Sequence, residues 1–372
     1  MKTHLRALAG DLVCTGRGIL AIDESSGTCN ARFAKLGIAQ TEEQRRAYRE
    51  LLITAPGIGE FVSGMILFDE TIRQSTQGGV RFVDALRNRG IAVGIKVDTG
   101  TSLLSFTTEE TITEGLDGLR NRLADYRAMG ATFAKWRAVF RIAADTPSPR
   151  AIQANAHALA RYAALCQESG IVPIVEPEVL ADGDHSLERC ADVTRTVLRA
   201  VFRELEEQGV FFEGIVLKPS MVLAGFSNSR QPALSETVAA TLLVLRDAVP
   251  ATVPGIAFLS GGQDDRAATQ RLGALNAASH GAPWALTFSY GRAIQRPALE
   301  HWGGRREFVP KAQSILLQRA YQNALAARGA YDPANEDRLL IGLASQLQSR
   351  CDERTLAATH IPNASANASV LR

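Results

Sequence analysis

Lysine is scarce in this 372-residue chain, although basic residues are not. Of the 41 Lys and Arg residues only six are lysines, and the other 35 are arginines. Arginine stays protonated in proteins, whereas a desolvated lysine can lose its proton and act as an amine nucleophile. Three of the six, Lys96, Lys135 and Lys218, lie near the ends of apolar runs. These three are candidates for amine chemistry, and the alternative is chance retention in salt bridges at strand ends.

The sequence also lacks the features of membrane, secreted and nucleic-acid-binding proteins. No apolar run approaches the roughly 20 residues that span a bilayer, and the first residues carry no apolar signal-peptide core. A net charge of +2, without Lys and Arg clusters interleaved with aromatic residues, gives no basic patch for nucleic acid. We therefore expect a cytoplasmic protein with no nucleic-acid partner and no membrane contact.

Metal and disulfide patterns are absent as well. The five cysteines include no CxxC spacing, and the six histidines form neither an HxH nor an HExxH motif. His185 lies beside acidic residues, in Asp182-Gly-Asp-His, and we expect it to be a solvated loop residue. The sequence therefore predicts no metal.

Eight apolar, strand-like runs alternate with segments of helical periodicity. The runs span residues 17–23, 61–68, 91–98, 132–140, 171–178, 212–218, 255–262 and 284–292. Such alternation predicts a parallel sheet with helical crossovers, and eight is the strand count of the closed barrel. The predicted fold class is α/β, a (β/α)8 TIM barrel, with a single domain at 1–360 and a mobile, small-residue tail at 361–372.

One run ends unusually, because Phe212-Glu-Gly-Ile-Val-Leu-Lys218 closes on an ammonium group just before Pro219. A buried strand rarely carries a charge without a reason. In the run at 132–140, the two-residue period of a strand places Lys135 and Arg137 on one face and Trp136 on the other. An antiparallel edge strand with a wet face could show the same pattern.

In a parallel barrel the ends of the strands share one rim, where barrel enzymes hold their active sites. The rim would collect five cations and four carboxylates: Lys96, Lys135, Arg137, Lys218 and Arg292 with Asp23, Asp98, Glu176 and Glu178. A phosphate monoester carries about −1.5 to −2 charges, so this mouth suits a phosphorylated substrate. Any single pair could instead be a structural ion pair.

The last two strand-like runs end in small residues, as barrel phosphate sites do. Ser260-Gly261-Gly262 and Ser289-Tyr290-Gly291-Arg292 supply hydroxyls, close backbone approach and one planar cation. A Gly-Gly pair alone often marks only a turn, and it is the position in the barrel that favours phosphate.

For Lys218 to be a nucleophile it must be neutral part of the time, and a neighbouring cation such as Lys135 disfavours its charged form. A neutral amine could form a Schiff base with a ketone. Glu176 and Glu178 could then move protons, and Asp23 is a further candidate base.

The sequence closely resembles the class I, Schiff-base-forming fructose-bisphosphate aldolases over residues 10–330. Seven motifs carry the resemblance in order: Gly18-Ile-Leu-Ala-Ile-Asp-Glu-Ser25, Gly94-Ile-Lys-Val-Asp98, Phe133-Ala-Lys-Trp-Arg137, Ile174-Val-Glu-Pro-Glu178, Leu217-Lys-Pro219, Phe258-Leu-Ser-Gly-Gly-Gln263 and Trp284-Ala-Leu-Thr-Phe-Ser-Tyr-Gly-Arg292. The resemblance implies reversible cleavage of fructose 1,6-bisphosphate into dihydroxyacetone phosphate and glyceraldehyde 3-phosphate, in glycolysis and gluconeogenesis, by a homotetramer without a cofactor.

The resemblance also assigns roles to residues. It implies that Lys218 forms the Schiff base, Glu176 is the main proton shuttle, Asp23 takes the C4 hydroxyl proton, and Lys135 and Glu178 support the chemistry. One phosphate would bind at Ser260, Gly261, Ser289, Gly291 and Arg292, and the other near Ser25, Lys96 and Arg137.

Two positions depart from the family pattern. Many members end in a tyrosine that helps to exchange the enamine proton, whereas this chain ends Ser-Val-Leu-Arg372 and its last tyrosine is Tyr331. We therefore expect slower proton exchange on dihydroxyacetone phosphate, and removing the last ten residues should slow it less than in tyrosine-tailed members. Thr28 replaces a serine but keeps the hydroxyl.

Two alternatives differ in class. The same chemistry could act on fructose 1-phosphate or sedoheptulose 1,7-bisphosphate, which relative turnover would separate. A phosphosugar-binding scaffold without activity would need a broken site, whereas the four central residues are intact: Lys218, Glu176, Asp23 and Lys135.

Overall fold

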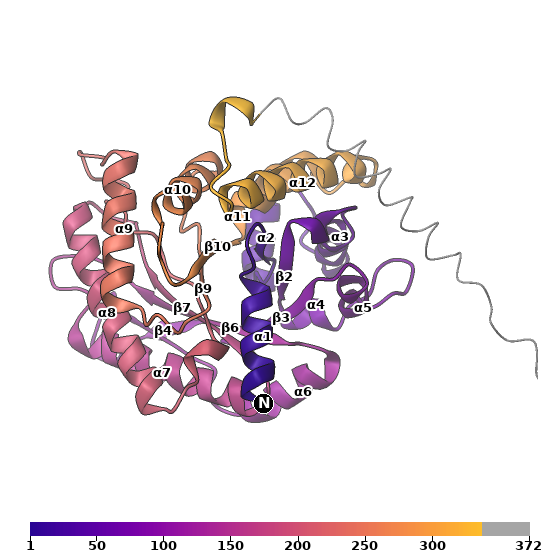
Figure 1. Ribbon diagram of the computed structural model, residues 1–372. Helices are drawn as coiled ribbons and strands as arrows, with labels where there is room; N and C mark the ends of the chain where they lie inside the picture. Colours follow the sequence, from indigo (N-terminus) through magenta and orange to yellow (C-terminus); the bar gives the residue numbers. More distant parts are fainter. Residues whose placement is uncertain (337–372) are drawn as a thin grey trace, which may run out of the picture.

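The eight predicted strands close into one barrel. In the computed structural model, which describes residues 1–336, the parallel strands are hydrogen-bonded in the order β1-β10-β9-β8-β7-β6-β3-β2 (Figure 1). Their bounds are β1 (Gly18–Ala21), β2 (Val62–Leu67), β3 (Ala92–Lys96), β6 (Phe133–Phe140), β7 (Val172–Val179), β8 (Val216–Leu217), β9 (Gly255–Phe258) and β10 (Ala285–Tyr290). The predicted (β/α)8 TIM-barrel fold is confirmed.

Helices surround the barrel and begin at residues that the sequence marks. Side chains of Thr41, Ser148 and Ser186 accept hydrogen bonds from the first turns of α3, α7 and α8. The helices are α1 (Lys2–Leu12), α2 (Ser26–Lys35), α3 (Glu42–Ile53), α4 (Asp69–Ile72), α5 (Phe82–Arg87), α6 (Leu119–Met129), α7 (Pro149–Glu168), α8 (Leu187–Glu207), α9 (Leu234–Ala248), α10 (Asp265–Ala278), α11 (Arg292–Trp302) and α12 (Val309–Ala326). Short 3₁₀ turns lie at η1 (Ile58–Glu60), η2 (Phe212–Gly214), η3 (Arg306–Phe308) and η4 (Pro333–Asn335).

The barrel interior changes from apolar to charged along the strands. Because strand side chains alternate, Ile19, Ala21 and Asp23 point inward from the first strand and its exit. Phe133 belongs to the inner apolar cluster, whereas Ala134, Trp136 and Ala138 belong to the cluster between strands and helices. The predicted placement of Lys135 on the face opposite Trp136 is therefore confirmed.

Helix α1, which the sequence reading did not predict, closes the apolar end of the barrel. Leu5 and Leu12 belong to the inner cluster, and the Ser63 hydroxyl at the start of β2 donates to the Leu12 carbonyl at 2.6 Å. Inside the barrel, Gly94 makes room for Phe133, since a Cβ there would lie 2.2 Å from its ring. The charged ends of the strands therefore form the open end.

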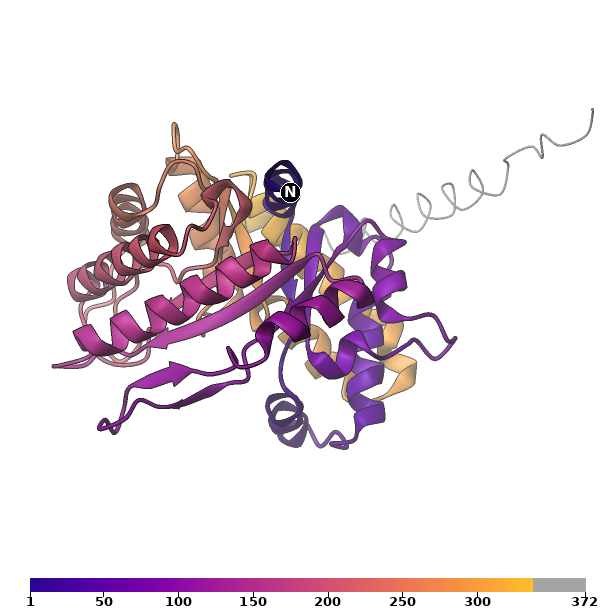
Figure 2. The same cartoon turned by 90° about the horizontal axis from the view of Figure 1, so that it is seen from below.

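A two-stranded hairpin is a second unpredicted element. Strands β4 (Thr101–Leu103) and β5 (Thr111–Thr113) pair antiparallel and project beside β6 and α7 (Figure 2). The Thr113 hydroxyl donates to the Arg137 carbonyl at 2.7 Å, and the Asn155 amide donates to the Thr111 carbonyl at 2.8 Å. These bonds hold the base of the hairpin next to the end of β6.

The run that ends in Lys218 is less regular than a strand. Its first residues form η2, and only Val216 and Leu217 pair in the barrel. The Gln167 side chain stabilises the turn by donating to the Phe211 and Gly214 carbonyls at 2.8 and 3.2 Å. Because these backbone groups are already paired, they do not join the sheet.

The predicted domain boundary at residue 360 and the predicted tail at 361–372 lie outside the described residues. Within residues 1–336, no helix has the length and hydropathy that a membrane crossing requires.

Candidate active site

Four charged side chains form an alternating row inside the open end of the barrel. Lys135 Nζ lies 2.8 Å from Asp23 Oδ2 and 3.3 Å from Glu176 Oε2. The other Glu176 oxygen, Oε1, lies 3.1 Å from Lys218 Nζ. Four separate strands, β1, β6, β7 and β8, thus bring together the four residues that the sequence singled out.

The row is almost fully buried, with exposed fractions of 9% for Asp23, 4% for Lys135, 4% for Glu176 and 3% for Lys218. Burial acts to raise the pKa of Asp23, but Lys135 and Lys218 outweigh it and lower that pKa to about 2. Burial acts likewise on Glu176, and the same two ammonium groups hold its pKa below the usual value. Both carboxyl groups are therefore ionised at neutral pH.

Lys135 is held as a cation. Burial alone would lower its pKa, but Asp23 and Glu176 raise that pKa above the ordinary value. The carboxylate of Glu176 separates Lys135 from Lys218 instead of leaving the two amines in direct contact. The immediate neighbour of Lys218 is thus a proton acceptor, which suits a proton shuttle.

The position of Lys218 follows from the end of its strand. Its backbone N–H donates to the Val175 carbonyl at 2.8 Å, and the next carbonyl, that of Pro219, accepts from Leu259 N–H at 3.1 Å. Both neighbouring strands therefore fix the backbone, while the side chain keeps the inward direction of Val216.

A second set of paired charges lies nearer the mouth. Lys96 Nζ is 2.7 Å from Asp98 Oδ1, and the Arg137 guanidinium pairs with Glu178. The Arg137 backbone N–H also donates to Asp98 Oδ2 at 3.4 Å, which links the two pairs. The cations predicted to bind phosphate here are thus already partnered with carboxylates.

The exits of β9 and β10 form a different surface. Gly261 and Gly262 adopt φ values of +54° and +84°, which favour glycine, and a Cβ at Gly262 would lie 3.6 Å from Arg292 Nη2. The Ser289 hydroxyl is buried without a hydrogen-bond partner among the described residues. Arg292 begins α11, is exposed and has no ion-pair partner within residues 1–336. These groups can receive an anion without first releasing another one.

At the first strand exit, Ser25 caps helix α2. Its hydroxyl accepts from Thr28 N–H at 3.3 Å and lies 3.1 Å from the Thr28 hydroxyl. The threonine that replaces a serine here therefore keeps a hydroxyl beside Ser25. The two hydroxyls and the helix N-terminus form a surface suited to an anion.

The sequence reading missed the support of this exit. Glu24 is flanked by Arg32 Nη1 at 2.6 Å and by the buried Arg49 Nη1 at 2.9 Å. Gln295 of α11 also donates to Glu24, at 3.1 Å. The position of Glu24 next to Asp23 in the sequence could have indicated that it supports this exit. A single glutamine in a helix, such as Gln295, carries no such signal.

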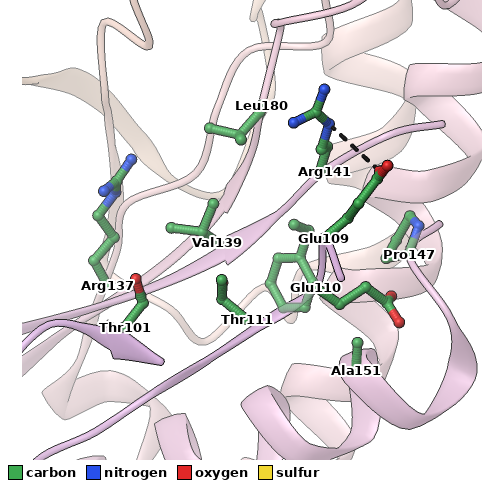
Figure 3. A pocket seen from close by; sticks show the side chains of 11 residues that line it. Thr101, Glu109, Glu110, Thr111, Arg137, Val139, Arg141, Pro147, Ala151 and Leu180 are labelled. Atoms are coloured by element: carbon green, nitrogen blue, oxygen red, sulfur yellow. Dashed lines mark ion pairs between the residues drawn. The ribbon is translucent and has the colours of Figure 1, made fainter. Parts of the chain in front are cut away.

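A pocket of about 220 Å³ adjoins the site at Arg137 (Figure 3). Arg137 and Arg141 stand on opposite sides of it, and Arg141 Nε lies 4.0 Å from Glu109 Oε2. The hairpin supplies Thr101 and Thr111 to its wall. The pocket is therefore an extension of the Arg137 side of the mouth and does not contain Lys218.

The expectation for His185 was wrong. It is only 8% exposed, because the loop after β7 packs against the segment after β8. Gly225 N–H donates to the His185 carbonyl at 2.8 Å, and Phe226 N–H donates to the Ala181 carbonyl at 2.8 Å. No three His, Cys, Asp or Glu side chains gather as a metal site anywhere in residues 1–336.

A (β/α)8 barrel whose open end holds buried lysines paired with ionised carboxylates, beside strand exits suited to anions, is the architecture of a barrel enzyme acting on phosphorylated substrates. Comparisons with known proteins identify the family. The model of the "Fructose-bisphosphate aldolase class-I" family matches residues 4–342. The chain belongs to the class I fructose-bisphosphate aldolases.

Relatives in distant organisms agree with this assignment. The chain is 51% identical to a probable fructose-bisphosphate aldolase class 1 of Xanthomonas campestris, covering 88% of this chain and 98% of that protein. It is 48% identical to the muscle-type aldolase of Lethenteron camtschaticum, over 89% and 92% of the two chains. A solved structure of fructose-bisphosphate aldolase from Plasmodium falciparum superposes with a TM-score of 0.88 at 47% identity, covering 89% of this chain and 96% of that one. The predicted function, class I aldol cleavage of fructose 1,6-bisphosphate, agrees with the family and with these names, and the protein is an enzyme.

Proposed function

We propose that this enzyme cleaves fructose 1,6-bisphosphate through a Schiff base on Lys218. The amine attacks the C2 ketone of the open-chain sugar, and loss of water gives an imine that draws electrons from the C3–C4 bond. Glu176 carries the protons of these steps, because its Oε1 lies 3.1 Å from Lys218 Nζ. That contact is the single observation that carries the proposal.

Asp23 is the base that removes the proton of the C4 hydroxyl. Its low pKa keeps it ionised, and its contact with Lys135 holds the carboxylate in place. As the C3–C4 bond breaks, glyceraldehyde 3-phosphate leaves and an enamine remains on Lys218. Protonation at C3 and hydrolysis then release dihydroxyacetone phosphate, and the same steps run backwards in condensation.

The two phosphates bind on opposite sides of the mouth. Ser260, Gly261, Ser289, Gly291 and Arg292 hold the C1 phosphate, while Ser25, Lys96 and Arg137 hold the C6 phosphate. Glu178 orients Arg137 through their ion pair. Two cationic ends favour a bisphosphate over fructose 1-phosphate, and sedoheptulose 1,7-bisphosphate is the remaining competitor, separable by relative kcat/KM.

The assembly and location are also proposals. A homotetramer in the cytoplasm accords with the family resemblance and with an Arabidopsis thaliana relative, 50% identical over 88% of this chain and 84% of that protein, whose name includes "cytosolic". Size-exclusion chromatography with light scattering tests the subunit number.

Borohydride trapping tests the mechanism. Reduction in the presence of dihydroxyacetone phosphate should leave a stable adduct on the peptide that contains Lys218. Lys218→Arg should abolish the adduct, and Lys35→Arg, a change at an exposed lysine, should not. An adduct on Lys96 or Lys135 instead, or loss of activity with EDTA, would refute the mechanism, and absent turnover would favour the scaffold alternative.

A further inference from the structure

One buried amide joins the two sides of the barrel mouth. Gln295, in the first turns of α11, is 0% exposed. Its Nε2 donates to the Ala21 carbonyl at the end of β1 and, at 3.1 Å, to Glu24 Oε1. Its Oε1 accepts from the Tyr48 hydroxyl at 2.9 Å. Both N–H groups and the carbonyl of this side chain are thus used.

The orientation of this amide is fixed by its partners. A carbonyl and a carboxylate face one end, so that end must be the NH2 group. Tyr48 is itself held in place, because its ring stacks on Trp302 of α11 at 5.6 Å and meets the edge of Phe33 of α2 at 5.8 Å. The bridge therefore cannot turn or shift without disturbing three helices.

The residues that Gln295 contacts flank the site. Ala21 and Glu24 stand on either side of Asp23 in the chain, and Ser25 follows Glu24. At the other end, Gln295 lies one turn after Arg292, and the backbone N–H of Gln295 donates to the Gly291 carbonyl at 3.0 Å. Gly291 also packs closely on β1, since a Cβ there would lie 3.3 Å from the Ala21 carbonyl.

We propose that Gln295 is a positioning residue that fixes the separation between the β1 exit and the amino end of α11, and so gives the enzyme its preference for sugar bisphosphates over monophosphates. The inference rests on the proposed function. A bisphosphate must meet both ends at once with its ketone at Lys218, whereas fructose 1-phosphate meets only the α11 end. A displacement of about 1 Å between the ends therefore penalises the bisphosphate selectively.

Substrate discrimination measures this role. Gln295→Met keeps the volume but removes all three hydrogen bonds, and kcat and KM would be measured for fructose 1,6-bisphosphate and fructose 1-phosphate. Any displacement of Asp23 lowers kcat for both sugars and cancels in the ratio of their kcat/KM values. We expect that ratio to fall about tenfold, mainly through a higher KM for the bisphosphate.

Two further variants guard against a loss of folding. Tyr48→Phe removes only the hydroxyl that holds Oε1 and should lower the ratio in the same direction by a smaller factor. Gln322→Met is the matched control, because Gln322 is also buried, in α12, and donates at 3.4 Å to the Glu336 carbonyl. It should leave the ratio unchanged.

An unchanged ratio in folded Gln295→Met overturns the inference. If that variant does not fold, an unchanged ratio in Tyr48→Phe does the same. Borohydride trapping on Lys218 is run in parallel with dihydroxyacetone phosphate, which has a single phosphate and should still form the adduct in both variants. An adduct with an unchanged ratio overturns the role of Gln295 alone, whereas no adduct in the unaltered enzyme overturns the proposed function and this inference with it.

Discussion

The charges inside the barrel and those at its mouth are satisfied in different ways. In the row Asp23, Lys135, Glu176 and Lys218, every charge has an opposite partner within 3.3 Å and at most 9% of any residue is exposed. At the mouth, the Arg137 side chain is 42% exposed, and Arg292 has no ion-pair partner in residues 1–336. The row is thus fully paired and buried, whereas the mouth is more exposed and, within residues 1–336, leaves Arg292 without an ion-pair partner.

The two sides of the mouth also differ from each other. Lys96 and Arg137 must leave Asp98 and Glu178 at least in part to bind a phosphate, whereas the β9 and β10 exits offer Arg292 and the Ser289 hydroxyl directly. Binding a phosphate at the β9 and β10 exits therefore breaks no ion pair. We infer that the β9 and β10 side anchors the sugar and the other side discriminates among sugars.

Removing the central cation of the row should have the largest effect. Lys135→Met leaves Asp23 and Glu176 buried without their shared ammonium group, and breaking a buried pair in this way costs about 3–5 kcal/mol. We expect the free energy of unfolding at pH 7 to fall by that amount, and kcat to fall roughly 10³-fold since both carboxylates lose their place. Denaturant unfolding and steady-state kinetics measure the two losses.

The control for this variant is Lys311→Met, which removes an exposed lysine. It should change neither the free energy of unfolding nor kcat appreciably. Equal effects of the two substitutions would show that burial of the row has no energetic consequence.

Acid should weaken the row by a smaller amount. The pKa of Asp23 is lowered from 3.8 to about 2 on folding, so its stabilising contribution is complete above pH 4 and is lost as the pH falls towards 2. One shift of this size corresponds to about 2 kcal/mol. Urea unfolding of the enzyme and of Asp23→Asn across this pH range isolates the contribution.

Between pH 4 and pH 2, the free energy of unfolding of the unaltered enzyme should fall more steeply than that of Asp23→Asn. Below about pH 2 the two proteins should show the same pH dependence. If both lose stability in parallel from pH 5 to pH 2, the ion pair with Lys135 does not hold the pKa of Asp23 down.

The two sides of the mouth can be separated with two arginine variants. Arg292→Ala should raise the KM of fructose 1,6-bisphosphate and of fructose 1-phosphate about tenfold, because both sugars carry the C1 phosphate. Arg137→Ala should raise the KM of the bisphosphate by a similar factor and leave that of fructose 1-phosphate near its original value. The measurement is steady-state kinetics of both variants on both sugars. An equal rise in KM for both sugars in Arg137→Ala would contradict the assignment of the two phosphates to different sides of the mouth.

The sequence predicted the barrel from eight apolar runs that alternate with helical segments, and it predicted the row from the charged residues at the ends of those runs. Apolar residues at alternate positions, followed by Asp23, Lys135, Glu176 or Lys218 in the same phase, indicate an inward side chain at the open end. The shared rim of a parallel barrel then places the row, and the motifs shared with known aldolases imply its chemistry.

What the sequence could not predict depends on contacts between distant segments. Gln295 and Glu24 are 271 residues apart and meet only because β1 and β10 are the strands that close the barrel. The hairpin β4–β5 was missed because its strands are only three residues long and contain no apolar run, and β4 is exposed. His185 looked solvated because nothing local shows that a segment 40 residues later covers it.

The smallest expected effect concerns the competition between Asp98 and the C6 phosphate for Lys96. Asp98→Asn removes the carboxylate that lies 2.7 Å from Lys96 Nζ but keeps a similar shape. A partly exposed pair of this kind is worth up to about 1 kcal/mol, so the KM of fructose 1,6-bisphosphate should fall about threefold. Fructose 1-phosphate serves as the internal control and should keep its KM. A higher KM for the bisphosphate would instead mean that Asp98 orients Lys96 towards the phosphate. Both sides of the mouth would then be in position before substrate binds, as the row beneath them is.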